Sequence, residues 1–162
     1  MNISSQSALN VIGCDLAAEV LRTNGNLRLG VTGWSMFPAV WPGDTICVER
    51  AAINEICEGA VVLFSRDQRL FAHRVVKTAT DPQGSYIVTR GDAMRDPDAP
   101  VFENELLGRV TGILRNGNYM DAAKSPRLFA RAVSTLIQRS EIASRVVVGV
   151  HGLRTASRTQ TA

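Results

Sequence analysis

Apolar residues near the start of the chain recur at three- and four-residue intervals. Between residues 5 and 22 these positions are Ala8, Leu9, Ile12, Leu16, Val20 and Leu21. The spacing predicts an amphipathic helix, because residues three and four apart share one helix face. Asn24-Gly25-Asn26 follows and is typical of a helix end. We therefore expect residues 1–26 to form an N-terminal helical segment.

From Leu27 onward the pattern changes to short apolar runs separated by turn residues. The runs are Leu27–Thr32, Thr45–Glu49, Ala60–Phe64, Leu70–Thr78, Ser85–Thr89 and Leu107–Leu114. Glycine, proline and aspartate lie between them, for example at Pro42-Gly43-Asp44. Short strands with frequent turns are typical of all-β barrels or coiled sheets, not of α/β folds. The sequence therefore predicts a mainly β domain over residues 27–115.

A third pattern follows Ser125-Pro126. Apolar and basic residues fall on different faces of a predicted amphipathic helix that runs toward Val148, within a helical region of residues 116–154. We favour a helix that packs on the barrel or on a partner subunit. The alternative is a peripheral helix, residues 127–154, that contacts an anionic membrane surface. Residues 155–162 are expected to form a frayed tail.

Composition narrows the possible functions. The chain has 162 residues, which favours one domain, and its formal charge of +3 is too small to indicate nucleic-acid binding. Its three cysteines, Cys14, Cys47 and Cys57, lack any zinc-binding spacing, so we predict no metal, no cofactor and no disulfide framework. No export signal or apolar stretch of about 18 residues is present, so a cytoplasmic protein is expected.

The segment Gly33-Trp34-Ser35-Met36-Phe37-Pro38 places a serine directly after a predicted strand. A serine nucleophile needs a nearby base, and histidine suits that task near neutral pH. His73 is the only histidine inside the predicted β region, on a strand face shared with Phe71 and Val75. Taken alone, Ser35 is more typical of a turn serine and His73 of a packed core histidine than of a catalytic pair.

A loop with several carboxylates completes the candidate group. Asp92 and Asp98 lie six residues apart in the segment Gly91-Asp92-Ala93-Met94-Arg95-Asp96-Pro97-Asp98. A carboxylate that accepts the second ring N–H of His73 would fix its tautomer and stabilise the imidazolium. Taken alone, aspartates in such a loop are more typical of turns and solvated charges than of a catalytic group.

Five short motifs, in order and in register, resemble the signal peptidase I group of serine proteases, which shares its β-fold with the self-cleaving domain of the SOS repressor. They are Gly33-x-Ser35-Met36-x-Pro38, Pro42-Gly43-Asp44, Gly59-Ala60-Val61-Val62 with Phe64, His73-Arg74-Val75, and Gly91-Asp92 with Asp98. The resemblance covers roughly residues 27 to 115. It implies a signal-peptidase-like coiled sheet or barrel between an N-terminal and a C-terminal helix.

The resemblance also implies a role for each matched position. Ser35 matches the nucleophile, and His73 matches the general base of the branch that has histidine instead of lysine. Asp98 is the favoured partner of His73, with Asp92 supporting, and the reverse assignment stays open. The residues around the nucleophile, Gly33, Trp34, Met36 and Pro38, would contact the substrate. The implied activity is endopeptidase cleavage of a peptide or precursor protein after small residues.

Three departures from the family pattern are visible. Gly33 stands where many members have a serine that helps to stabilise the oxyanion, and Ala93-Met94 replaces typical asparagines. The sequence also predicts no membrane anchor of the kind that the family has, so we expect either peripheral membrane contact or a soluble substrate. The Gly33 and Ala93-Met94 departures support an alternative, a catalytically weak or inactive relative that binds a peptide or partner as a regulatory domain. A self-cleaving repressor role is disfavoured because no Ala-Gly cleavage site precedes Ser35.

Overall fold

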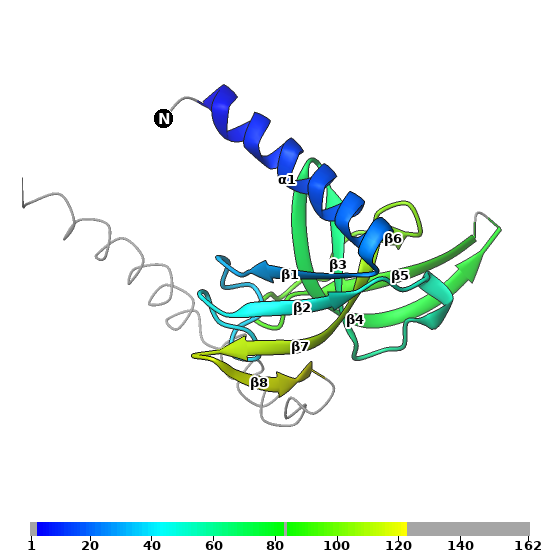
Figure 1. Cartoon of the computed structure of the whole chain (residues 1–162). Coiled ribbons are helices and arrows are strands. Elements are labelled where there is room, and N and C mark those ends of the chain that lie inside the picture. The colour runs from blue at the N-terminus through cyan, green and yellow to red at the C-terminus, as the bar shows by residue number, and fades with distance from the viewer. Residues whose placement is uncertain (1–2, 83, 123–162) are drawn as a thin grey trace, which may run out of the picture.

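The computed structural model describes residues 3–82 and 84–122. Figure 1 shows the long helix α1 (Ile3–Asn24) beside a β-sheet, and the described residues also form a short 3-10 helix, η1 (Ile53–Glu55). The sheet has eight strands, which are β1 (Asn26–Gly30), β2 (Thr45–Glu49), β3 (Val61–Arg66), β4 (Arg69–Asp81), β5 (Gly84–Arg90), β6 (Val101–Phe102), β7 (Leu106–Arg115) and β8 (Asn118–Asp121). The predicted mainly β class is confirmed.

Helix α1 ends where the sequence predicted. Gly25 has a positive φ of 73° and donates its N–H to the carbonyl of Leu21 at 3.0 Å, which is typical of a helix C-terminus. The predicted buried face is wrong in part, because Ile12 and Leu16 are exposed. The buried side chains described for α1 are instead those of Cys14, Ala17 and Leu21. The helix meets the sheet through its second half (Figure 1), where Leu21 inserts into the core.

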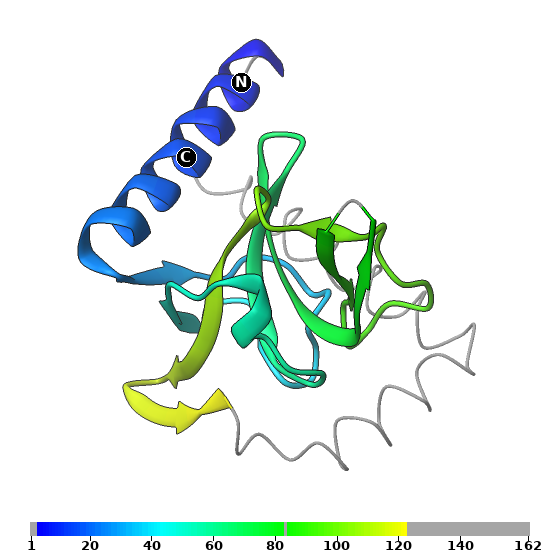
Figure 2. The same cartoon turned by 90° about the vertical axis from the view of Figure 1, so that its right-hand side faces the viewer.

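The sheet is antiparallel, with the strand order β1-β2-β7-β3-β4-β5-β6. The long strand β7 joins its parts: β2 pairs along one edge, and β3 and β8 follow one another along the other edge. Register shifts interrupt the β2–β7, β3–β7 and β4–β5 pairings, and such bulges increase local twist and bend a sheet. Figure 2 shows the strongly curled sheet that results.

Strand β3 is buried on both faces and separates two apolar cores. Val61 and Leu63 contribute to a core that also receives Leu21 from α1. Val62 and Phe64, which point to the opposite face, contribute to a second core. Residues of β4 alternate in the same way, so neighbouring residues on β4 serve opposite faces of the sheet.

All six predicted strands are present, with ends shifted by up to three residues. Two further strands were not predicted. β6 has only two residues, and β8 is a mostly exposed strand without an apolar alternation. β8 also extends the sheet past residue 115. The predicted helix after Ser125-Pro126, the membrane-contact region 127–154 and the tail at 155–162 lie outside the described residues.

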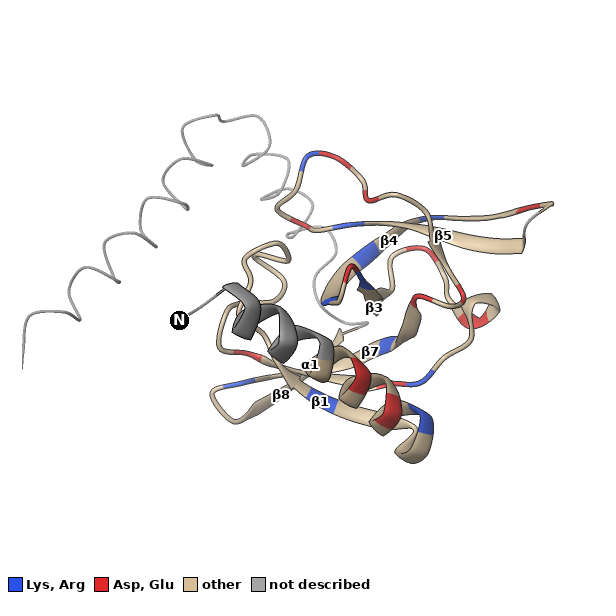
Figure 3. Ribbon diagram, turned by 90° about the horizontal axis from the view of Figure 1, so that it is seen from above, with Lys and Arg blue, Asp and Glu red and all other residues tan. Residues whose placement is uncertain are grey.

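Acidic and basic residues are interspersed over the described part of the chain (Figure 3). In residues 3–82 and 84–122, no helix is long and apolar enough to cross a membrane.

Candidate active site

Strand β4 brings His73 to the second core. Its side chain is 5% exposed and lies beside the rings of Phe64 and Phe71, with ring centroids 6.0 and 5.9 Å away. Val75 lies on the same face and is buried in that core. The predicted alternation along β4 is therefore confirmed. A polar ring held among apolar side chains needs specific hydrogen-bond partners.

Ser35 lies in the connection between β1 and β2, and the first core holds the residues that directly follow the serine. Met36 and Val40 are buried in the first core, and the Val40 N–H donates to the Met36 carbonyl at 3.0 Å. At the base of this connection the Val31 N–H donates to the Asp44 carbonyl at 2.8 Å. The backbone around Ser35 is therefore anchored, and Ser35 itself is only partly buried.

Asp98 lies in the connection between β5 and β6 and is fixed from two sides. The Asp98 N–H donates to the Thr89 carbonyl at 2.8 Å, and the Thr89 hydroxyl donates to Asp98 Oδ2 at 2.6 Å. On the other side, Arg66 donates to the carbonyls of Ala99 and Pro100 at 3.1 and 2.7 Å. These bonds tie the segment that carries Asp98 to strands β5 and β3.

These three segments bring Ser35, His73 and Asp98 into one hydrogen-bonded chain. His73 Nε2 is 3.0 Å from Ser35 Oγ, and His73 Nδ1 is 2.7 Å from Asp98 Oδ2. Both distances lie within the range of hydrogen bonds. With the ring proton on Nδ1, Nε2 can accept the serine proton, so this geometry can activate a hydroxyl for nucleophilic attack.

Asp92 does not contact His73. It accepts two hydrogen bonds from Arg74, from Nε at 2.8 Å and from Nη2 at 2.7 Å. Arg74 Nη1 also donates to the Gly59 carbonyl at 2.9 Å. Of the two aspartates that the sequence left open, the structure places Asp98 at the histidine and Asp92 in a bidentate ion pair on the other face of β4.

Gly91 packs directly against the serine backbone. A Cβ atom at this position would lie 2.6 Å from the Ser35 carbonyl oxygen and 3.1 Å from Ser35 Cβ. The Ala93 N–H donates to the same Ser35 carbonyl at 2.9 Å. The absence of a side chain at Gly91 thus allows the aspartate-bearing loop to set the position of Ser35.

The backbone beside Ser35 also offers a hydrogen-bond donor. No residue in the described part of the chain accepts the Ser35 N–H, and Gly33 is exposed and has no hydroxyl. A backbone N–H at a nucleophile can stabilise the oxyanion of a tetrahedral intermediate. If an oxyanion forms here, the Ser35 N–H is therefore a suitable donor.

Aromatic side chains line the connection that carries Ser35. The Phe37 ring lies 5.9 Å from Trp34 and 5.0 Å from Trp41, between ring centroids. Trp41 is 43% exposed and donates its indole N–H to the Pro38 carbonyl at 2.8 Å. Of the predicted substrate-contacting residues, Gly33, Trp34 and Pro38 are thus at least partly accessible, whereas Met36 is buried.

An ion pair that the sequence did not predict holds the same connection. Asp44 is buried and accepts hydrogen bonds from Arg115 of β7, the shortest at 2.6 Å, and from the Trp41 N–H at 2.7 Å. Burial acts to raise the pKa of Asp44, but these hydrogen bonds outweigh it and lower the pKa. The Pro42-Gly43-Asp44 motif was the available signal, but its partner is 71 residues away.

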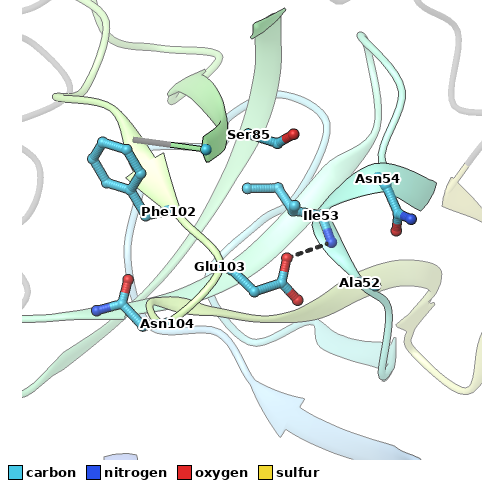
Figure 4. A pocket seen from close by; sticks show the side chains of 8 residues that line it. Ala52, Ile53, Asn54, Ser85, Phe102, Glu103 and Asn104 are labelled. Atoms are coloured by element: carbon cyan, nitrogen blue, oxygen red, sulfur yellow. Dashed lines mark hydrogen bonds between the residues drawn. The ribbon is translucent and has the colours of Figure 1, made fainter. Parts of the chain in front are cut away.

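Two other features do not add a site. The described residues contain no group of three or more His, Cys, Asp or Glu side chains that could hold a metal ion. A separate surface pocket lies between η1, the start of β5 and the turn after β6 (Figure 4). Its one carboxylate, Glu103, accepts the Ile53 N–H at 2.9 Å, so it already serves to hold η1.

Comparison with known proteins adds no assignment. No protein-family model and no curated protein matches this chain.

Proposed function

We propose that this protein is a serine endopeptidase of the signal peptidase I-like type. One observation carries the proposal: the continuous chain from Ser35 Oγ through the His73 ring to Asp98 Oδ2, with contacts of 3.0 and 2.7 Å. Isolated turn serines and core histidines need no such arrangement. The resemblance of the surrounding motifs adds the reaction class and the coiled β-fold of that family.

In the proposed mechanism, His73 Nε2 takes the Ser35 proton while Ser35 Oγ attacks a peptide carbonyl. The Ser35 N–H stabilises the oxyanion, and Asp98 stabilises the imidazolium. His73 then gives the proton to the leaving amine, which leaves an acyl group on Ser35. Water, activated by His73, hydrolyses this ester and restores the enzyme.

The proposed substrate is an extended peptide or a precursor protein. Strand β1 is an edge strand of the sheet and leads into the connection that carries Ser35. The open edge of β1 can therefore pair with the backbone of an extended substrate. Trp34 and Pro38 border the same connection. Cleavage after small side chains is the specificity that the family resemblance suggests.

The test measures cleavage of peptides with small residues before the scissile bond, with products identified by mass spectrometry. We expect Ser35→Ala and His73→Ala each to lower the rate by about 10⁴-fold or more, because either change removes the nucleophile–base pair. Asp96→Asn is the matched control, since Asp96 is an exposed residue of the same loop. Undiminished cleavage by either alanine variant would contradict the proposal.

A second candidate is a peptide-binding regulatory domain without catalysis. Gly33 favours it, because the position beside the nucleophile lacks a side-chain donor. This candidate predicts peptide binding with equal affinity by wild type and Ser35→Ala and no product from either. Acylation of Ser35 by a serine-directed inhibitor would rule it out.

A further inference from the structure

We propose that Thr89 is a positioning residue for this site: its buried hydroxyl holds the Asp98 carboxylate against His73 and thereby fixes the histidine tautomer. This inference rests on the proposed serine peptidase function. It concerns a residue that belongs to none of the motifs on which the resemblance depends.

The surroundings of Thr89 give no packing reason for a hydroxyl. Thr89 is 0% exposed and pairs across the strands with Val75 of β4. Ile87, two residues earlier on β5 and thus on the same face, is buried in the second core. Valine has nearly the same shape as threonine and suits such an apolar position. The hydroxyl must therefore have a polar partner to be tolerated there.

That partner is the carboxylate which contacts His73. The Thr89 hydroxyl donates to Asp98 Oδ2 at 2.6 Å, and the same oxygen lies 2.7 Å from His73 Nδ1. An ionised carboxylate only accepts hydrogen bonds, so Nδ1 must carry the ring proton. Nε2 is then unprotonated and faces Ser35 Oγ at 3.0 Å. This is the tautomer that a general base requires.

Without the hydroxyl, Asp98 has an alternative. Its side chain is 26% exposed, so the carboxylate can rotate toward water. The backbone bond from Asp98 to Thr89 would keep the loop in place but would not orient the carboxylate. His73 would then lose its anionic partner and its fixed ring orientation. The other charged groups nearby, Arg66 on β3, Arg74 on β4 and Asp92, Arg95 and Asp96 in the loop, would be unchanged.

The test compares wild type, Thr89→Val and Thr89→Ser as full-length chains. A fluorophosphonate probe measures the rate of Ser35 acylation across pH. We expect Thr89→Val to slow acylation by at least about tenfold, a part of the roughly 10⁴-fold loss known for removing the orienting carboxylate in a serine protease. The acid limb of its pH profile should move to lower pH, because the imidazolium loses its counter-charge. Thr89→Ser should restore both the rate and the limb.

Nitrogen-15 NMR of the His73 ring gives a readout that does not depend on activity. Wild type and Thr89→Ser should show the proton on Nδ1, and Thr89→Val a mixture of tautomers. His73→Ala identifies the signal against His151, the only other histidine. Thermal melts identify a variant that fails to fold.

The outcomes separate the two proposals. If wild type does not react at Ser35, the proposed function fails and this inference fails with it. If wild type reacts and folded Thr89→Val reacts equally fast, with the same acid limb and tautomer, only the role of Thr89 is overturned. A rate loss that Thr89→Ser does not restore would also overturn it, because it would assign the effect to packing.

Discussion

His73 and Arg74 are neighbours on β4, yet the two faces of the strand use them in different ways. Each contacts an aspartate from the same loop, His73 contacting Asp98 and Arg74 contacting Asp92. On the His73 side the contact continues to the Ser35 hydroxyl, so a proton has somewhere to move. On the Arg74 side, a permanently charged guanidinium donates two hydrogen bonds to the Asp92 carboxylate and transfers no proton.

The difference shows how the connection between β5 and β6 can be fixed to the sheet at Asp92 and still supply Asp98 to the proposed reaction. The Arg74–Asp92 pair lies at the start of the loop, and the Arg74 bond to Gly59 joins it to the turn before β3. Asp98 lies at the loop's far end and is left to orient His73. We therefore expect changes on the Arg74 side to affect stability first, and changes on the His73 side to affect the reaction first.

Among the variants that test this comparison, Asp98→Asn should have the largest effect. The change keeps size but removes the charge and offers an amide to His73, which favours the wrong tautomer. We expect kcat/KM for peptide cleavage to fall by about 10³–10⁴-fold. The free energy of unfolding, from urea titration, should change by less than about 1 kcal/mol, because the carboxylate is partly hydrated in the native state.

Asp92→Asn is the paired variant that makes the comparison decisive. It should lower the free energy of unfolding by about 2 kcal/mol, because it leaves the half-buried Arg74 without a counter-charge. At a temperature where it is folded, its kcat/KM should stay within about tenfold of wild type. If the two variants exchange behaviour, the roles assigned to the two aspartates are reversed.

The residues of this site differ in how far the sequence alone predicts their roles. The motifs and the strand alternation led to Ser35 and His73, and they narrowed the histidine partner to Asp92 or Asp98. The family resemblance favoured Asp98, but the reverse assignment stayed open, because the choice depends on which end of an irregular loop crosses to which face of β4. No local pattern encodes that path.

The same limit applies to the fold. Strands with clear apolar runs were predicted well, whereas β6, with two residues, and β8, mostly exposed, carried no periodic signal. The buried face of α1 was predicted from its apolar positions, but Ile12 and Leu16 on that face are exposed, whereas Cys14 and Ala17 are buried. The roles of Arg115 and Thr89 were not predicted, because each depends on a partner that only the folded chain brings into contact, and neither residue belongs to a motif.

A smaller effect is expected from Gly91→Ala, which adds a methyl group at the point where the loop meets Ser35. The new Cβ would lie 2.6 Å from the Ser35 carbonyl oxygen and 2.7 Å from Met94 Cγ. Met94 can move aside, but the Ser35 backbone must shift, and a shift of about 1 Å at a reacting group can cost about 100-fold. We expect kcat/KM to fall by about 10- to 100-fold.

Gly13→Ala is a matched control for this change. It adds the same methyl group on the exposed surface of α1, where nothing lies within 4 Å. Its kcat/KM should equal that of wild type. If Gly91→Ala also leaves kcat/KM unchanged, the loop does not set the position of Ser35 and this part of the comparison is wrong.

The smallest effect concerns acid stability and extends the comparison to a second fixed pair. Asp44 and Arg115 hold the Ser35 connection as Asp92 and Arg74 hold the neighbouring loop. Although burial opposes it, hydrogen bonding lowers the pKa of Asp44, and the Arg66 hydrogen bond lowers that of Glu105. Carboxyl groups with a lowered folded pKa add stability above their unfolded pKa, near 4, and lose it as pH falls through the folded value.

Urea titrations should therefore show a falling free energy of unfolding below about pH 4. Asp44→Asn should remove about 1–2 kcal/mol at pH 7 and make the decline in acid shallower, because one of the groups that titrates is gone. An equally steep decline in Asp44→Asn would mean that the Asp44–Arg115 pair does not hold the connection through its charge.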